Sequence, residues 1–247
     1  MKIVERPHSG TGVAAKIDGP ALKPRDAATL IMVRCDTTKP RVLMGKRSEN
    51  HAFLPGVFVF PGGRVDAADS RVKPANPLDP KVEQKLMARM RGTPSAGRAR
   101  ALAMAALRET FEETGLIIGT DAGAPGASKH PDWAAFLATG LRPALAPVRY
   151  IARAITPPGR IRRFDTRFLV VDAENVSNLD SPAGSTDELL DVHWLTIADT
   201  QDLQLPWITR QVLKTLDEQL QQKSGLAPGG PVIFQRQRGN NWYNETL

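Results

Sequence analysis

Three carboxylates near the middle of the chain are its strongest chemical signal. Glu109, Glu112 and Glu113 stand at positions i, i+3 and i+4, and Gly115 follows them at a point where a helix can end. On a helix this spacing gathers three like charges on one face near the C-terminus, where the helix dipole disfavours anions. One interpretation is a solvated acidic patch with Arg108 paired to Glu112. The other is a hard divalent cation such as Mg²⁺, which takes carboxylate oxygens as ligands.

A glycine-containing turn upstream of these carboxylates favours the cation. Residues 57–60 form an apolar, β-prone run that breaks into Pro61, Gly62 and Gly63. Two adjacent glycines permit a tight loop whose backbone approaches a ligand closely. The sequence therefore predicts a strand and a glycine loop beside an acidic helix.

This combination resembles the signature of the Nudix hydrolase family: Gly, five residues, Glu, seven residues, then Arg-Glu-apolar-x-Glu-Glu-x-Gly-apolar. The matching residues of the second half are Arg108, Glu109, Glu112, Glu113, Gly115 and Leu116. Thr110 stands where an aliphatic residue is usual, and Asp69 follows Gly63 where the family has Glu. Residues 70–107 separate Asp69 from Arg108, which is 38 residues against seven, so the signature carries an insertion of 31. This leaves the role of Asp69 open.

The resemblance implies an α+β fold, an α/β/α sandwich with a mixed β-sheet between helices and an inserted helical segment inside the signature. It also implies a hydrolase that cleaves a pyrophosphate bond in a nucleoside diphosphate derivative, with Mg²⁺ or alternatively Mn²⁺ as cofactor. We expect one domain over 1–247, with a core of about 25–222, an insertion of about 70–98 and a C-terminal tail at 224–247. The alternative is a catalytically silent domain that senses a nucleotide.

The same resemblance supplies candidate site residues. The expected metal ligands are Glu109, Glu112 and Glu113. The catalytic candidates are Glu112, Glu109, Arg108 and Glu188. Arg108 is expected to orient a carboxylate through a bidentate fork. Family members take the general base from a helix glutamate or from a late loop, where Asp187 or Glu188 is the candidate here. An exposed turn with solvated acids is the other interpretation of that loop.

A second, partial resemblance concerns the substrate. One branch of the family, the coenzyme A diphosphatases, has Arg, Ser or Ala, three residues, Arg, three residues, Gly, three residues and Phe-Pro-Gly-Gly. Arg47, Ser48, Gly56 and the run 60–63 fit in register, whereas Ala52 stands where the second Arg belongs. The substrate-binding candidates are Arg47, Ser48, Gly62 and Gly63, and coenzyme A or its acyl form is the candidate substrate. A strand end with a solvated cation is the alternative for Arg47 and Ser48.

Composition narrows the class of partner. A net charge of +7 favours an anionic ligand, and the basic residues are dispersed, so we expect a small nucleotide diphosphate and neither nucleic acid nor membrane. The densest basic run, 160–163, lies in a turn that is either solvated or faces a phosphate. A single cysteine and the absence of an apolar export segment lead us to expect a cytoplasmic protein. A homodimer is left open.

Hydrophobic periodicity predicts the elements that must position these residues. Strands are expected over 27–35, 41–47, 57–60, 116–119, 149–155, 167–172 and 189–195. Helices are expected over 80–91, 95–114, 131–139 and 200–222. The first two strands should form a hairpin about the turn at 36–40, and the acidic face should end the second helix.

Overall fold

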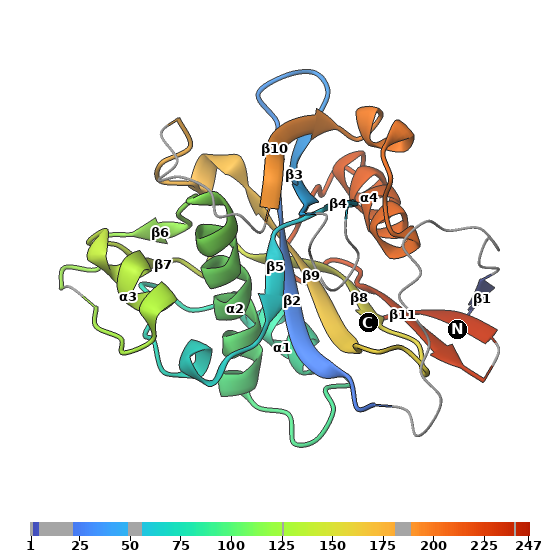
Figure 1. The fold of residues 1–247 in the computed structure, drawn as a ribbon, viewed down its shortest axis with the longest axis horizontal. Helices are drawn as coiled ribbons and strands as arrows, with labels where there is room; N and C mark the ends of the chain where they lie inside the picture. Colours follow the sequence, from blue (N-terminus) through green and yellow to red (C-terminus); the bar gives the residue numbers. More distant parts are fainter. Residues whose placement is uncertain (1, 5–21, 49–55, 125, 181–188, 240) are drawn as a thin grey trace.

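The computed structural model describes residues 2–4, 22–48, 56–124, 126–180, 189–239 and 241–247, and a large mixed sheet lies at its centre (Figure 1). The strands of this sheet are β1 (Lys2–Val4), β2 (Arg25–Arg34), β3 (Arg41–Arg47), β4 (Phe58–Val59), β5 (Gly62–Arg64), β8 (Arg149–Ile155), β9 (Phe164–Asp172), β10 (Leu189–Thr196), β11 (Ile233–Arg238) and β12 (Asn241–Thr246). Their order is β1-β12-β11-β8-β9-β2-β3-β10, while β4 pairs with β3 and β5 with β2. A separate pair joins β6 (Gly119–Thr120) to β7 (Arg142–Pro143).

Helices cover both faces of the sheet. They are α1 (Pro80–Met87), α2 (Ala96–Thr114), α3 (Pro131–Ala138) and α4 (Trp207–Leu220), with 3₁₀ turns η1 (Ala67–Ser70), η2 (Ala173–Asn175) and η3 (Asp199–Asp202). Side chains from α1, α2 and α3 share one hydrophobic core with the sheet, and side chains from α4 share a second core on the opposite face. Figure 1 shows α2 and α4 on either side of the strands. The predicted α+β sandwich with an inserted helical segment is therefore confirmed.

Strand β2 illustrates how sequence alternation builds the two cores. Leu30 and Met32 point into the core beneath α2, whereas Ile31 and Val33 point into the core beneath α4. Successive side chains of a strand face opposite sides, so a strand buried on both faces reads as a continuous apolar run. This is the reason that the apolar run was recognisable as a strand. Its hairpin with β3 also forms as expected.

Helix α2 follows the predicted range closely. The Ser95 side chain accepts a hydrogen bond from the backbone N–H of Arg98, and Gly115 ends the helix in the left-handed conformation at φ 70°. Both are the standard chemistry of helix ends. The buried side chains of α2 include Ala99, Ala103 and Ala106, which let the helix lie close to the sheet.

Helix α1 ends earlier than the predicted range of 80–91. A buried side chain from β8 explains the difference, because the Arg153 guanidinium donates hydrogen bonds to the carbonyls of Ala88 and Arg89. These carbonyls lie just beyond Met87, and Arg89 adopts a positive φ of 55°. A contact between distant segments thus stops a helix whose local pattern would continue.

The expected strand at 116–119 is wrong for most of its length. In the described structure residues 116–118 belong to no strand, and the loop residues Ser177 and Asn178 hydrogen-bond to Ile117 instead. The Asn178 side chain accepts from the N–H of Ile117, at 2.8 Å, and donates to the carbonyl of Gly115. The Ser177 N–H donates to the carbonyl of Ile117. Only Gly119 enters a strand, β6.

The last predicted helix begins at Trp207 instead of near 200. Residues 199–202 form the 3₁₀ turn η3, and Pro206 is the N-cap residue of α4. Proline disfavours the helical conformation in the residue before it, so Leu205 cannot continue a helix from η3 into α4.

Residues 224–247 hold more structure than a tail. Strand β11 pairs in parallel with β8 and in antiparallel with β12, and β12 pairs with β1. Val232 and Phe234 are buried, and the Arg153 guanidinium lies over the Phe234 ring. The hairpin therefore extends the sheet beyond the expected core.

Candidate functional site

A cavity of about 1120 Å³ lies where the second half of α2 meets the glycine loop and the first residues of β2. Alternate residues of two neighbouring strands line it: Ala27 and Thr29 from β2, and Phe164 and Thr166 from β9. The acidic residues in its lining are Asp66, Glu109, Glu112 and Asp132. The predicted site residues Arg47, Gly62, Gly63, Arg108, Glu109 and Glu112 all line this cavity.

The glycine loop is held against both the sheet and the acidic helix. Residues 62–64 form β5, which pairs with β2. Gly62 has φ 150°, and a Cβ on it would come within 3.0 Å of the backbone of Ala28 and Thr29, so only glycine fits. The Gly62 N–H donates to Glu113 Oε2 at 2.9 Å. Glu113, itself buried, thereby ties the end of α2 to the loop.

Gly63 makes room for one of the predicted metal ligands. A Cβ at Gly63 would come closer than 3.0 Å to Cδ and both oxygens of the Glu109 side chain. The carboxylate of Glu109 therefore occupies the space that any side chain at position 63 would need. This contact places a carboxylate directly on the loop backbone.

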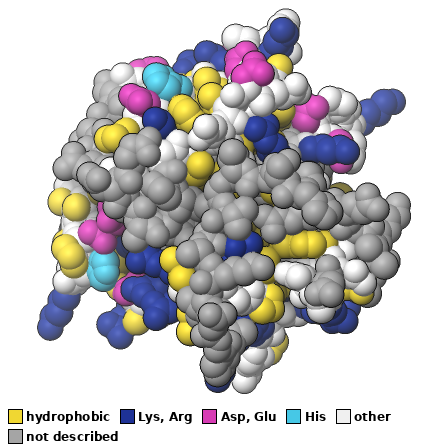
Figure 2. Space-filling view, turned by 45° about the vertical axis from the view of Figure 1, so that its right-hand side comes forward, with side chains coloured by type: hydrophobic (Ala, Val, Ile, Leu, Met, Phe, Trp, Pro, Cys, Tyr) yellow, Lys and Arg dark blue, Asp and Glu magenta, His cyan; other side chains and the backbone are white. Residues whose placement is uncertain are grey.

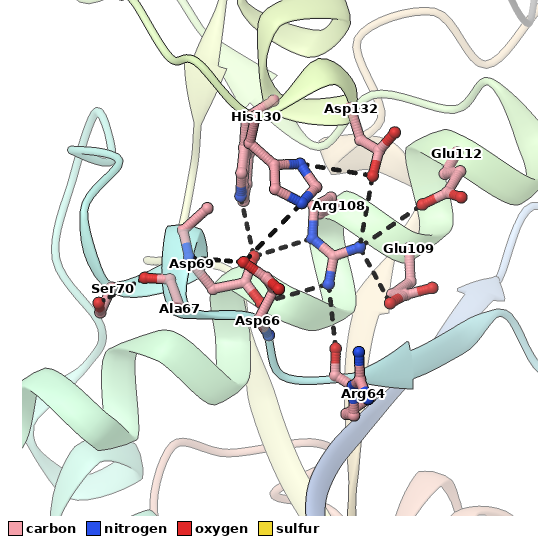
Figure 3. A network of polar contacts seen from close by, with 12 residues as sticks. Arg64, Asp66, Ala67, Asp69, Ser70, Arg108, Glu109, Glu112, His130 and Asp132 are labelled. Atoms are coloured by element: carbon pink, nitrogen blue, oxygen red, sulfur yellow. Dashed lines mark hydrogen bonds and ion pairs between the residues drawn. The ribbon is translucent and has the colours of Figure 1, made fainter.

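Arg108 is the centre of the polar network drawn in Figure 3. Its Nε and Nη2 donate to the two oxygens of Asp69 at 2.9 and 3.2 Å, and Nη2 also donates to the carbonyl of Arg64. Its Nη1 lies 2.9 Å from Glu109 Oε1 and 3.5 Å from Glu112 Oε2. Burial alone would lower the pKa of Arg108, but its contacts with Asp69 and Glu109 outweigh burial and raise that pKa. The bidentate fork that the sequence predicted for Arg108 is therefore present, and the carboxylate that it holds is that of Asp69.

Asp69 has the structural role that the sequence left open. It is fully buried, and besides the Arg108 fork it accepts hydrogen bonds from Trp133 Nε1 at 2.8 Å and from the Asp66 N–H at 2.7 Å. A buried carboxylate is tolerated when it is paired and its oxygens are hydrogen-bonded. Despite the long insertion, Asp69 therefore joins the glycine loop, α2 and α3.

Among the polar cavity residues that were not predicted from the sequence, Asp66, His130 and Asp132 lie around Arg108. His130 lies between two acids, with Nδ1 3.5 Å from Asp132 Oδ2 and Nε2 3.8 Å from Asp66 Oδ1 (Figure 3). Asp132 is also 3.9 Å from Arg108 Nη1. A hydrogen bond from the Ala68 N–H, with the charges of His130 and Arg108, lowers the pKa of Asp66 although burial opposes this. The only sequence signal was the start of a helix at Pro131 after a loop, which says nothing about where that helix packs.

Known proteins resemble this chain in sequence and in fold. No family model matches the chain. A solved Nudix hydrolase from Alicyclobacillus acidocaldarius superposes with a TM-score of 0.55 at 29% identity, covering 78% of this chain and 90% of that one. The chain has the Nudix fold. Among curated proteins, "Putative nudix hydrolase 7" of Caenorhabditis elegans is 29% identical over 184 residues, which is 69% of this chain. The chain spans about half the length of that relative, 51%.

A more distant Nudix domain, that of NrtR from Shewanella oneidensis, was solved with ADP-ribose; its TM-score is 0.45 at 12% identity, with coverage of 81% of this chain and 90% of that one. The two closer similarities support a Nudix-type fold and a relationship to Nudix hydrolases. They give no specific support to the coenzyme A diphosphatase branch.

The three glutamates of α2 lie in different surroundings. Glu109 and Glu112 line the cavity, whereas Glu113 is buried against the Gly62 N–H. Within the described residues, no group of three or more His, Cys, Asp or Glu side chains is arranged to hold a metal ion. The donors nevertheless fit a hard cation in chemistry, because Mg²⁺ is usually bound by one or two carboxylates together with water and substrate phosphates.

Two of the predicted site residues are not placed in the cavity. Ser48 follows the end of β3 and is absent from the residues that line the cavity. Glu188, with its neighbour Asp187, lies outside the described residues.

In the described part of the chain no helix is both long and apolar enough to cross a bilayer.

Proposed function

We propose that this protein is a divalent-metal-dependent hydrolase that cleaves the pyrophosphate bond of a nucleoside diphosphate derivative. The observation that carries the proposal is the contact of the Glu109 carboxylate with Gly63, beside Glu112 and inside one cavity. This places acidic oxygens and loop backbone around the same space. A phosphoryl-transfer site needs charge neutralisation and positioning more than covalent chemistry.

Each side chain has a proposed part in this reaction. Glu109 and Glu112 would hold the cation, and Glu113 would either join them or keep the glycine loop in place. Mg²⁺ is the proposed ion and Mn²⁺ the alternative. When bound, such an ion neutralises phosphoryl oxygens and lowers the pKa of a water molecule. Arg108, fixed by Asp69, keeps both carboxylates oriented toward the cavity.

The substrate's negative charge would meet basic residues of the same cavity. Arg64 follows the glycine loop, and Arg47 comes from the end of β3. The general base is proposed to be Glu109, Glu112 or Glu188. Coenzyme A or acyl-coenzyme A is the proposed substrate because Arg47, in register with the coenzyme A diphosphatase box, lines the cavity.

The dispersed positive charge of the surface favours a small-molecule partner over a nucleic acid. On the face shown in Figure 2, the visible Lys and Arg side chains lie in separate groups and not in one continuous patch. We accordingly propose a nucleotide-sized ligand in a cytoplasmic, single-domain protein, and we propose no membrane or nucleic-acid partner. Homodimerisation is tested by light scattering on the purified chain.

A nucleotide sensor without turnover is the second candidate function. One observation favours it: Arg108 Nη1 is near both Glu109 and Glu112, so their charges are partly balanced without a cation. A sensor would bind nucleotides with the carboxylates in this state.

One experiment separates the two functions. The protein is incubated with Mg²⁺ or Mn²⁺ and coenzyme A, acyl-coenzyme A, ADP-ribose, NADH or a dinucleoside polyphosphate, and the products are separated by chromatography. Two products from cleavage between phosphates, lost on adding EDTA, are expected of the hydrolase. Tight binding with no cleavage of any compound would overturn the hydrolase and leave the sensor.

A further inference from the structure

The cavity has a second charged region besides the acidic one. Two segments form it: residues 22–25, which lead into β2, and residues 161–163, which lead into β9. We call these residues the basic wall. The basic wall has Lys23, Arg25 and Arg162 in the cavity lining, and it contains no acidic residue.

Sheet register separates this wall from the glycine loop. β5 pairs with one edge of β2 and β9 with the other, so that Gly63 lies beside Ala28, while Arg25 lies beside Phe164. Strands in a sheet are about 4.8 Å apart, so β9 is roughly 10 Å across the sheet from the glycine loop. A ligand whose diphosphate sits at the glycine loop would therefore reach the basic wall with another of its groups.

Hydrogen bonds hold the two segments of the wall together. The Arg25 N–H donates to the carbonyl of Arg163 at 2.9 Å. The Arg163 guanidinium donates to the carbonyls of Leu22 and Thr156, and Arg91 donates to the carbonyl of Pro24. Burial, and the charge of Arg91, lower the pKa of Arg163. The Arg163 side chain thus holds the two segments together. The other cations of the wall, Lys23, Arg25 and Arg162, line the cavity.

The remaining cations have no counter-charge in the described structure. Among the described residues, the side chains of Lys23, Arg25 and Arg162 have no hydrogen-bond or ion-pair partner. Bringing like charges together is unfavourable unless an anion compensates them. The same wall carries Leu22 and Ile161, two of the three exposed large hydrophobic side chains in the described residues, at 45% and 38% exposure. Leu22 and Ile161 thus add apolar surface to the part of the cavity lining that carries these cations.

We propose that the basic wall binds a phosphate monoester of the substrate that is separate from its scissile diphosphate. This inference rests on the proposed function and makes the substrate a nucleoside diphosphate derivative with an additional phosphate. Two guanidinium groups and an ammonium group suit a dianionic phosphate, because guanidinium donates paired hydrogen bonds to its oxygens. Leu22 and Ile161 then contact the apolar parts of the group that carries the phosphate.

Binding measurements test the wall without depending on catalysis. Calorimetry in EDTA compares AMP with adenosine 3′,5′-bisphosphate and adenosine 2′,5′-bisphosphate, which differ from AMP only by the extra phosphate. We expect at least one bisphosphate to bind about tenfold or more tightly than AMP, a ratio that corresponds to one good charge-assisted contact. The double variant R25Q/R162Q should lose this difference.

A matched control separates local contact from overall charge. The double variant K73Q/K223Q removes two exposed positive charges outside the cavity lining and should keep the wild-type ratio. Equal affinity of the wild-type protein for AMP and both bisphosphates would overturn the proposal. So would an R25Q/R162Q protein that keeps the wild-type ratio, or a K73Q/K223Q protein that loses it. Circular dichroism checks that each variant is folded.

Activity measurements distinguish a failure of this inference from a failure of the proposed function. Cleavage of NADPH is compared with NADH, and of coenzyme A with its 3′-dephospho form, in the presence of Mg²⁺. A higher kcat/KM for one phosphorylated partner, lost in R25Q/R162Q through a raised KM, supports the basic wall. Cleavage without discrimination overturns the wall and leaves the hydrolase. No cleavage, with the calorimetric difference intact, overturns the hydrolase and leaves the wall.

Discussion

The indole N–H of Trp133 donates a 2.8 Å hydrogen bond to the carboxylate of Asp69, and both side chains are completely buried. Asp69 in turn holds Arg108 through both of its oxygens, and Arg108 contacts Glu109 and Glu112. A residue of α3, which follows α2 in the chain, therefore supports the orientation of the proposed metal ligands. We regard Trp133 as a positioning residue.

Trp133→Phe tests this relationship. The substitution keeps an aromatic ring beside Phe136, whose ring lies edge-on to it, but removes the donor to Asp69. Loss of a hydrogen bond to a buried charge should lower the free energy of unfolding by about 1–3 kcal/mol. It should also reduce kcat more than it raises KM. Urea unfolding and steady-state kinetics measure both effects. Trp207→Phe, on the far helix α4, is the control; equal losses of kcat in the two variants would contradict a positioning role.

Gly63→Ala tests the contact that carries the proposed function. The new methyl group would overlap the Glu109 carboxylate and displace it from the loop. A displacement of about 1 Å at a reacting centre can reduce the rate about a hundredfold, so we expect a loss of that order in kcat. Gly97→Ala, at the start of α2, meets nothing within 4 Å and should keep activity while gaining up to about 1 kcal/mol in stability. Near-normal kcat in Gly63→Ala would show that Glu109 does not act from this position.

Glu112→Gln and Glu113→Gln test the acidic face directly. Each substitution keeps side-chain size and removes one negative charge. Turnover should fall at least about a hundredfold in each, in line with the loss of a key electrostatic group at a phosphoryl-transfer site. Because Glu113 is buried and accepts a 2.9 Å hydrogen bond from Gly62, its variant should lose more stability than Glu112→Gln, whose contact with Arg108 is 3.5 Å long. Activity assays and thermal unfolding give the comparison. Rates near the wild-type value in either variant would contradict our assignment of that residue.

Asp26→Asn tests the dependence of stability on pH. Burial would raise the pKa of Asp26, but ion pairs with Arg167 and Arg98 outweigh burial and hold this pKa below its ordinary value of 3.8. A carboxyl group whose pKa is lowered by folding contributes stability above its unfolded pKa, and this is lost as pH falls through the folded pKa. Below about pH 4 the variant should therefore lose stability less steeply than the wild-type protein. Urea unfolding from pH 6 downward in about one-unit steps measures the slopes; parallel curves would contradict the assignment.

Local pattern was sufficient wherever neighbouring residues decide the structure. Helix α2 begins after Ser95 and ends at Gly115 as expected, because capping depends on a few adjacent residues. The start of α4 was also readable in principle, since Pro206 restricts Leu205. By contrast, the end of α1 depends on Arg153 from a distant strand, and no local pattern contains that information.

The sequence by itself determined the acidic face of α2 and the glycine loop, since these follow from side-chain period, capping and glycine's conformational freedom. The sandwich fold was implied by the resemblance of its motifs to the Nudix signature. Only the tertiary structure decided how the glutamates divide, with Glu109 on Gly63 and Glu113 on the Gly62 N–H. It also decided that Asp69 anchors Arg108 across the insertion and that residues 22–25 and 161–163 form one wall. The physical reason is that burial and hydrogen bonding between distant segments are properties of packing, which sequence spacing does not record.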